Sequence, residues 1–254
     1  MRRLFEEPLL QGVDVDSDHL VEVHRRILER KPMLRRVFRE IYELCRSADD
    51  RYFDGLGRRI ELGSGSSLFK TYYPDVETSD LKTAPHLDLT LDAQALDLED
   101  RTVRALYGIH CFHHFPDPRR FFRELQRVLI PGGGCVLIEP YHGPLANWFF
   151  RRMFDLEHYD PLAISWESSN RDVGYMSHAN QALSYIVFTR DRSIFLREFP
   201  ELETSSRNDS ETSRAISCRA ASTSSGWFPI PSLQSFAESR SCLHLSIAFW
   251  RFTT

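Results

Sequence analysis

The sequence predicts an α/β fold, a three-layer α/β/α arrangement around one sheet. Between Arg58 and Asp80 the chain reads as a strand, a turn of small residues, the start of a helix and a second strand, which is how a nucleotide-binding α/β sheet begins. The run Cys135 to Ile138 is wholly apolar, as strands buried on both faces of a parallel sheet are. With 254 residues, 42% of them hydrophobic, the chain can bury a sizeable core.

Residues 1–50 are predicted to form an N-terminal helical segment. From Asp18 to Cys45, apolar residues recur at helical spacing among arginines and glutamates. We expect Pro32 to divide this stretch into two helices, because proline lacks the N–H that a continuous helix needs. The arginines are typical of a solvated face and not of a phosphate site. One interpretation of this segment is a helix that packs against the edge of the sheet.

Two glycines mark the turn after the first predicted strand. Gly63 and Gly65 stand where a strand passes into a helix, and glycine there permits a positive φ and a close approach of backbone to ligand. Asp80 ends the next strand, where a carboxylate can accept hydrogen bonds from both hydroxyls of a ribose. A dinucleotide site would require a third glycine at the position of Leu68.

Three further strands follow in order. Residues 87–91 alternate as a third strand should and end at Asp92, and 103–109 are a plausible fourth strand. The apolar run that ends at Ile138 is the fifth, and Glu139 follows it. Because open α/β sheets bind ligands at the carboxyl ends of their strands, Glu139 is a candidate contact to a polar substrate group.

The helix between the fourth and fifth strands has a clear start. Asp117 is a suitable N-cap and Pro118 suits the first helical position. Apolar residues then recur on one side up to Leu129, and Pro131 with the following glycines ends the helix.

Four motifs occur in the order typical of one enzyme family. They are Glu61-Leu62-Gly63-Ser64-Gly65, Leu91 to Leu96, Phe112 to Pro118, and Arg123 to Gly134. In these motifs the chain resembles the class I S-adenosylmethionine-dependent methyltransferases, methyltransferase type 11-like. The resemblance implies a Rossmann-like sheet with a binding core at 51–140, S-adenosylmethionine as cofactor, and N-terminal helices that can cover it. It also implies the cofactor-binding residues Glu61, Gly63, Ser64, Gly65, Asp80, Leu81, Asp92, Ala93 and His110.

Asp92 has two interpretations. The resemblance implies that its carboxylate accepts from the exocyclic amine of adenine while the backbone N–H of Ala93 faces the ring, and a carboxylate suits the amine because it only accepts hydrogen bonds. An isolated aspartate would instead be read as a turn residue or helix N-cap. The position of Asp92 within the motif series favours the adenine.

The run from His110 to His114 invites a zinc interpretation. In an extended segment His110 and His114 would face one way, whereas Cys111 and His113 would face the other. No second ligand cluster follows, so we expect no metal site. The resemblance places His110 near the methionine end of the cofactor and either His113 or His114 at the substrate mouth. For each of them a structural role remains an equal alternative.

Methyl transfer requires a base only if the acceptor must lose a proton. His114 and Glu139 are the candidate catalytic residues, and the sequence does not choose between them.

After the fifth strand the motifs fade. Residues 141–202 are predicted to form a cap or substrate segment, in which the aromatic-rich stretch 145–154 has helical spacing and suits a lid or packing helix better than a membrane-surface helix. The stretch 180–188 suits a helix or a strand. Residues 203–254 are rich in Ser, Thr and Arg, and only 243–252 resembles a strand. The remainder is either a shifted reading frame or an unusual substrate cap.

The composition of the chain indicates which classes of partner and which compartment to expect. A net charge of −4 and a pI of about 6.2 provide no global field that would attract nucleic acid. Five scattered cysteines without a C-x-x-C pair favour reduced thiols in a cytoplasm. No apolar run reaches about 18 residues, so no transmembrane segment is expected, and the start of the chain lacks the apolar core of a signal peptide.

The sequence therefore predicts a cytoplasmic S-adenosylmethionine-dependent methyltransferase that acts on a small molecule, a sugar or a lipid-linked acceptor. Two alternatives stay open. A nucleotide-sugar or NAD-dependent Rossmann enzyme would account for the two glycines and Asp80, but not for Leu68 or Asp92. A catalytically silent methyltransferase-like protein would keep the fold as a binding or scaffold protein. The sequence does not indicate the oligomeric state.

Overall fold

The computed structural model describes residues 7–14, 17, 19–140, 142–143, 147–148, 158–168, 179–206 and 245–252. Its helices and helical turns are η2 (Pro8–Leu10), α1 (His19–Arg30), α2 (Pro32–Tyr52), α3 (Phe69–Tyr72), η3 (Phe112–His114), α4 (Pro118–Val128), α6 (Leu183–Tyr185), η4 (Ile186–Arg190) and α7 (Arg192–Glu198). Its strands are β1 (Arg58–Leu62), β2 (Val76–Asp80), β3 (Leu89–Thr90), β4 (Val103–Ile109), β5 (Leu129–Pro140), β6 (Leu202–Ser206) and β7 (Leu245–Phe252).

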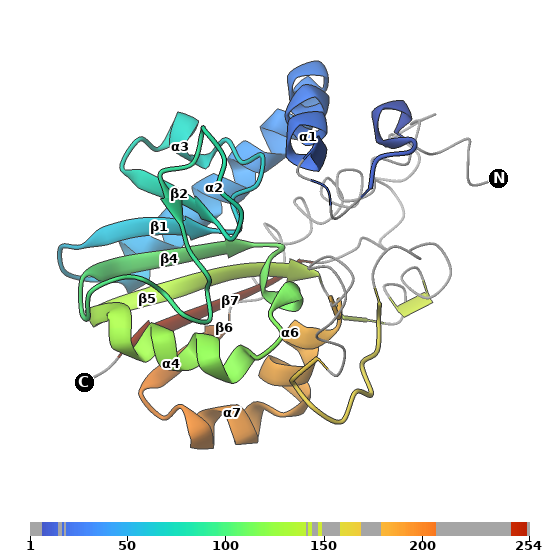
Figure 1. The fold of residues 1–254 in the computed structure, drawn as a ribbon. Helices are drawn as coiled ribbons and strands as arrows, with labels where there is room; N and C mark the ends of the chain where they lie inside the picture. Colours follow the sequence, from blue (N-terminus) through green and yellow to red (C-terminus); the bar gives the residue numbers. More distant parts are fainter. Residues whose placement is uncertain are drawn as a thin grey trace, which may run out of the picture.

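One sheet organises the molecule (Figure 1). Among the described residues it has seven strands in the order β3-β2-β1-β4-β5-β7-β6. The strands β1 to β5 run parallel to one another, whereas β7 runs antiparallel to both β5 and β6. Five parallel strands flanked by helices confirm the predicted α/β fold class.

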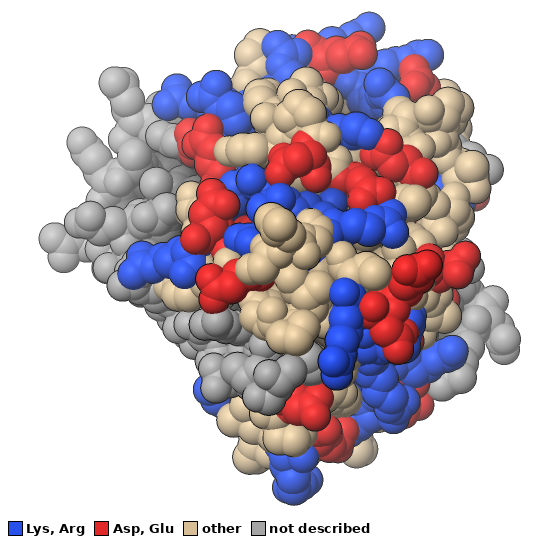
Figure 2. Space-filling model, turned by 90° about the vertical axis from the view of Figure 1, so that its left-hand side faces the viewer, with Lys and Arg blue, Asp and Glu red and all other residues tan. Residues whose placement is uncertain are grey.

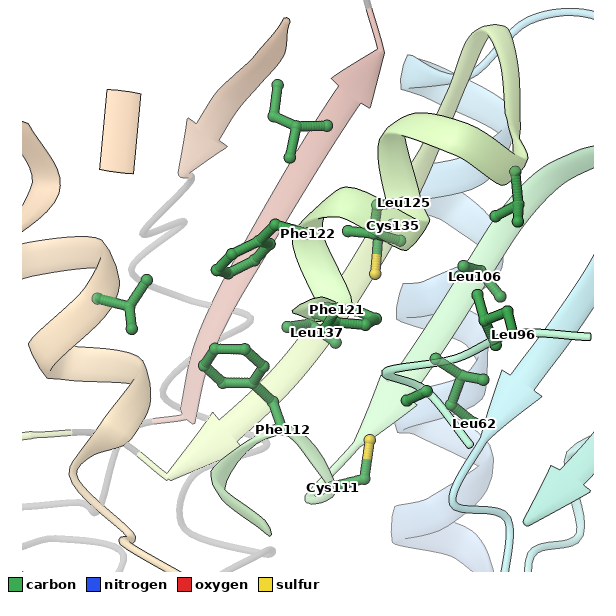
Figure 3. Close-up of a cluster of buried hydrophobic side chains, with 14 of the residues drawn as sticks. Leu62, Leu96, Leu106, Cys111, Phe112, Phe121, Phe122, Leu125, Cys135 and Leu137 are labelled. Atoms are coloured by element: carbon green, nitrogen blue, oxygen red, sulfur yellow. The ribbon is translucent and has the colours of Figure 1, made fainter. Parts of the chain in front are cut away.

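Along the central strands, successive side chains pack into buried clusters on opposite faces of the sheet. Ala105, Tyr107 and Val136 share a buried cluster with α2, whereas Leu106 and Leu137 lie in a larger cluster on the opposite face. This alternation is expected of strands covered on both faces, because successive side chains point to opposite sides of a sheet. Figure 3 shows the larger cluster, to which α4 contributes Phe121, Phe122 and Leu125.

The N-terminal helices divide at Pro32, as predicted, and this proline occupies the start of α2. The helix α2 packs on the sheet. The helix α1 is held instead by a smaller cluster that includes Val23, Ile27 and Leu34. Because Leu34 belongs to α2, the helix α1 packs on the start of α2, which also packs on the sheet.

Local sequence signals are mostly confirmed. The strands β2 and β4 lie where they were predicted, and the Asp117 side chain caps α4 by accepting from the backbone N–H groups of Arg119 and Arg120. The predicted strand 87–91 is shorter, because β3 contains only Leu89–Thr90. Just before it, the Asp88 carboxylate accepts from the backbone N–H and the hydroxyl of Thr78, each at 2.9 Å.

The carboxy-terminal part corrects one prediction. The sequence indicated one strand after residue 203, but the structure has both β6 and β7, which pair with each other. The strand β6 was missed because its Ser- and Thr-rich sequence lacks apolar alternation. Within the stretch 180–188, residues 183–188 are helical and form α6 and part of η4. Residues 207–244 and most of the predicted lid at 145–154 lie outside the described residues.

A buried carboxylate joins α2 to the amino-terminal ends of β1 and β4. The Asp49 side chain is 0% exposed and accepts from Arg59 Nε at 2.6 Å, Arg104 Nε at 2.7 Å and the Tyr107 hydroxyl at 2.8 Å. Arg46 Nη1 lies 3.4 Å away. Burial by itself raises the pKa of Asp49, but the hydrogen bonds from these arginines and the tyrosine hold it below its ordinary value. We refer to this group as the Asp49 cluster.

The face shown in Figure 2 carries acidic and basic side chains intermixed, with apolar and uncharged side chains between them. Charges of opposite sign placed close together largely cancel at a distance, so this face offers no field of one sign. Among the described residues no helix has the length and apolar character needed to cross a membrane.

Candidate functional site

A cavity of about 470 Å³ lies at the carboxyl ends of β1, β2 and β4. Loops that follow three parallel strands meet here, as in other open α/β sheets. The candidate base His114 is part of the lining. So is every residue that the sequence assigned to a cofactor, namely Glu61, Gly63, Ser64, Gly65, Asp80, Leu81, Asp92, Ala93 and His110.

The turn after β1 requires both of its glycines. Gly63 has a φ of +63° and Gly65 a φ of +47°, a region that residues with a side chain rarely adopt. A Cβ atom on Gly63 would also lie 2.8 Å from the Cβ of Cys111. The close approach at Gly63 is thus to the loop after β4, and it allows the two loops that wall the cavity to touch.

Glu61 is a buried acid at the cavity wall. It is 2% exposed, and its carboxylate accepts from Ser64 Oγ at 2.9 Å and Ser67 Oγ at 2.8 Å. Burial raises the pKa of Glu61 to about 8, a rise that the Ser67 and Ser64 hydrogen bonds oppose and the charge of Asp80 increases. No lysine or arginine among the described residues forms an ion pair with Glu61. A cation bound in the cavity would therefore stabilise the ionised carboxylate.

Asp80 fixes the glycine turn from the end of β2. Its Oδ2 accepts from the backbone N–H of Gly65 at 2.8 Å, and its Oδ1 accepts from the backbone N–H of Lys82 at 3.3 Å. His86 Nε2 lies 2.7 Å from the carbonyl oxygen of Gly65. The next residue, Leu81, is 38% exposed and lines the cavity. These contacts hold the carboxylate at the cavity before any ligand is present.

The position of Asp92 is compatible with both of its interpretations, as a turn residue and as a cavity residue. Its Oδ1 accepts from the backbone N–H of Gln94 at 2.8 Å, which is the turn contact that an isolated aspartate would make. The same side chain is exposed and lines the cavity, next to the buried Ala93. One carboxylate oxygen thus stabilises the turn, and within the described part of the chain Oδ2 accepts no hydrogen bond.

The run from His110 to His114 is not extended, which corrects the geometry assumed from the sequence. Strand β4 ends at Ile109, His110 has a φ of +53°, and η3 follows. His110, Cys111 and His114 line the cavity, whereas His113 is 3% exposed and lies beneath it. Of the two candidates for the substrate mouth, His114 is the one in the lining. Within the described residues no group of three or more His, Cys, Asp or Glu side chains is arranged to hold a metal ion.

Glu139, predicted as a substrate contact or base, is not among the residues that line this cavity. It is 1% exposed. Its Oε1 accepts from the backbone N–H groups of Cys111 at 3.0 Å and Phe112 at 2.9 Å, and its Oε2 lies 2.6 Å from His113 Nδ1. Burial raises the pKa of Glu139, but His113 and these N–H groups hold it below its ordinary value. A carboxylate with both oxygens occupied positions the loop that carries His110 and His114.

Part of this chain is similar in sequence to a known protein family. Residues 63–137 match the family model described as a methyltransferase domain. The match covers less than half of the chain and indicates a methyltransferase domain in that stretch. The match starts at the first glycine of the turn and ends within β5, so it contains the strands and loops that form most of the cavity.

Two solved structures are similar to this chain in overall fold. One is the carbon methyltransferase CurJ, with a TM-score of 0.50 and 12% identity, and the alignment covers 98% of this chain and 62% of CurJ. The other is a Haloferax volcanii methyltransferase solved with the activator Trm112, with a TM-score of 0.51 and 13% identity, and the alignment covers 95% of this chain and 99% of that one. At such identities the likeness concerns the fold alone.

The N-terminal helices contribute part of the cavity wall. Tyr42 of α2 lines the cavity, and its hydroxyl lies 3.1 Å from Ser67 Oγ and accepts from the backbone N–H of Leu68 at 3.0 Å. His24 of α1 also lines the cavity. Neither residue was predicted to lie at the site, although His24 stands four residues after Leu20 in the apolar stripe of its helix.

Proposed function

We propose that this chain binds S-adenosylmethionine in the cavity and transfers its methyl group to a small molecule, a sugar or a lipid-linked acceptor. One observation carries the proposal. Nine residues that the family resemblance assigns to the cofactor, in four separate stretches of sequence, line a single cavity at the carboxyl ends of the strands. A methyltransferase domain supplies the framework.

The lining suits the cofactor. A volume of about 470 Å³ falls in the usual range of ligand pockets, about 300–1,000 Å³. Asp80 offers acceptors for ribose hydroxyls, and Asp92 Oδ2 offers one for an exocyclic amine. Glu61, a buried acid without a cationic partner among the described residues, suits a positively charged part of the ligand.

When bound, S-adenosylmethionine supplies a methyl group that its sulfonium already activates. The chain then has to orient an acceptor and exclude water. Glu139 holds the loop after β4 through two backbone N–H groups, and that loop presents His110 and His114 to the cavity. Of the two bases considered from the sequence, His114 remains a candidate.

The direct test is calorimetry of the full chain with S-adenosylmethionine, S-adenosylhomocysteine and NAD side by side. We expect both adenosyl ligands to bind and NAD not to bind. Binding of NAD alone would support a nucleotide-sugar or NAD-dependent Rossmann enzyme and overturn the proposal. Tight binding of the adenosyl ligands with no methylated product across a broad acceptor panel would favour the silent, methyltransferase-like binding protein.

The proposal includes the division of the chain. The helical segment 1–50 covers the binding core 51–140, the cap 141–202 contributes to acceptor binding, and 203–254 completes the sheet with its terminal strand. It also includes a cytoplasmic location and a small-molecule acceptor in place of nucleic acid. Size-exclusion chromatography with light scattering would establish the oligomeric state.

A further inference from the structure

One face of α1 forms a wall of the cavity that none of the motif residues occupies. Leu20, Val21, His24 and Leu28 line the cavity from this helix. Three of these four side chains are apolar, and among the described residues of α1 that line the cavity His24 is the titratable one. The wall is therefore apolar with a single imidazole.

The His24 side chain has no hydrogen bond or ion pair to the described residues, although it is half-buried. Polar side chains that are removed from water normally have a hydrogen-bond partner. Burial also lowers the pKa of His24 from its ordinary value of 6.5, so the imidazole is uncharged at neutral pH and one ring nitrogen is an acceptor. An uncharged imidazole that faces a ligand cavity suits a ligand group that donates a hydrogen bond.

The other walls carry the remaining titratable groups. The cofactor carboxylates and the loop histidines lie at the strand ends, where the motifs place the cofactor, and α2 contributes one hydroxyl. The titratable groups that line the cavity together with His24 are Tyr42 from α2, Glu61 from β1, Asp80 and Lys82 from the end of β2 and its loop, Asp92 after β3, and His110, Cys111 and His114 after β4.

We propose that His24 faces the methyl-transfer position from the acceptor side of the cavity and accepts the hydrogen bond of the acceptor's hydroxyl or amine. The proposal rests on the proposed function and refines its acceptor class. The acceptor would have an apolar body, which packs against Leu20, Val21 and Leu28, and one hydrogen-bond donor at the atom that receives the methyl group.

The test measures the pKa of His24 by NMR in the full chain, with His24→Gln to assign the signal. The parent is titrated with S-adenosylhomocysteine and with sinefungin, in which a carbon that bears an ammonium group replaces the sulfur and methyl of the cofactor. A positive donor at the methyl position disfavours a second positive charge nearby, so we expect the His24 pKa to be lower by about one unit or more in the sinefungin complex. His19, an exposed residue of the same helix outside the cavity lining, is the matched control and should titrate alike in both complexes.

Each outcome decides the matter. A His24 pKa that is lower with sinefungin than with S-adenosylhomocysteine, with His19 unchanged, supports the assignment. Equal His24 pKa values in two saturated complexes place the imidazole away from the methyl position and overturn the inference, while the proposed function stands. If neither ligand binds, the proposed function fails and the inference fails with it.

Discussion

Two sets of carboxylates lie at opposite edges of the sheet, and their partners differ. In the Asp49 cluster, at the amino-terminal edge, a buried acid meets the charged groups of Arg46, Arg59 and Arg104. At the cavity, Glu61 meets hydroxyls and Asp80 meets backbone N–H groups. Among the described residues, the buried Asp49 is paired with arginines, whereas the buried Glu61 at the cavity has no cationic partner.

This difference separates stability from binding. A buried ion pair with all its partners in place fixes the elements that contribute to it, and removing one member leaves the others uncompensated. A buried acid without a cation costs folding free energy and becomes useful only when a ligand compensates it. The pKa values agree with this difference: the pKa of Asp49 is lowered and the pKa of Glu61 is raised.

The largest effect is expected at the Asp49 cluster. Asp49→Ala leaves the arginines and the Tyr107 hydroxyl without their buried acceptor, so the free energy of unfolding should fall by about 3–5 kcal/mol. Urea unfolding of the full chain measures it. The matched control is Asp50→Ala at the exposed neighbour, which should stay within about 0.5 kcal/mol of the parent. Equal losses of unfolding free energy in the two variants would contradict a stabilising role for Asp49.

Glu61 should give the ligand-free protein a pH dependence of the opposite sign to that of Asp49. The folded pKa of Glu61 is about 8 against an ordinary value of 4.5, so the folded state retains a proton that the unfolded state loses, and stability falls as pH rises between these values. Asp49, whose folded pKa is lowered, loses its contribution as pH falls below the ordinary range of aspartate.

Glu61→Gln removes this titration. The stability difference between variant and parent should change in favour of the variant with rising pH, by at most about 1.4 kcal/mol per pH unit. Chemical unfolding between pH 5 and 8 measures it, with Glu29→Gln on the exposed side of α1 as a control that should follow the parent. A flat difference between Glu61→Gln and the parent would show that Glu61 is already ionised in the free protein.

At Asp80 the effect should be on binding. Asp80→Ala removes two acceptors for the ribose hydroxyls, so the affinity for S-adenosylhomocysteine should fall by roughly 2–4 kcal/mol. Because Asp80 also accepts from the Gly65 N–H, stability should fall by about 1 kcal/mol. Calorimetry and urea unfolding separate the two quantities. Glu77→Ala, on the same strand but paired with Arg58, should leave affinity unchanged, and an Asp80 variant that binds like the parent contradicts the ribose assignment.

The smallest effect distinguishes the two roles of Asp92. Asp92→Asn can still accept from the Gln94 N–H, so stability should not change. If Oδ2 accepts from the adenine amine, affinity for S-adenosylhomocysteine should fall by about 1–3 kcal/mol. An analogue with inosine in place of adenosine presents a carbonyl there, and the variant should recover part of its binding. If the Asn variant has unchanged affinity for both ligands, Asp92 stabilises the turn and does not contact adenine.

The residues of local motifs were predictable from the sequence. Positive φ at Gly63 and Gly65 and the cap at Asp117 depend on a few neighbouring residues, so the chain encodes them locally. The convergence of Asp80 and Asp92 was predictable too, because the carboxyl ends of parallel strands share one edge of a sheet.

The sequence by itself therefore determined the α/β class, the glycine turn and the edge at which the residues predicted to bind the cofactor meet. Only the tertiary structure decided which side chains face the cavity. His24 reaches it because α1 docks beside the glycine turn, and Glu139 is withdrawn from it because the loop after β4 folds over its carboxylate. The sequence likewise did not determine the pairing of β6 with β7. These outcomes depend on contacts between distant parts of the chain, and no local period in the sequence specifies such contacts.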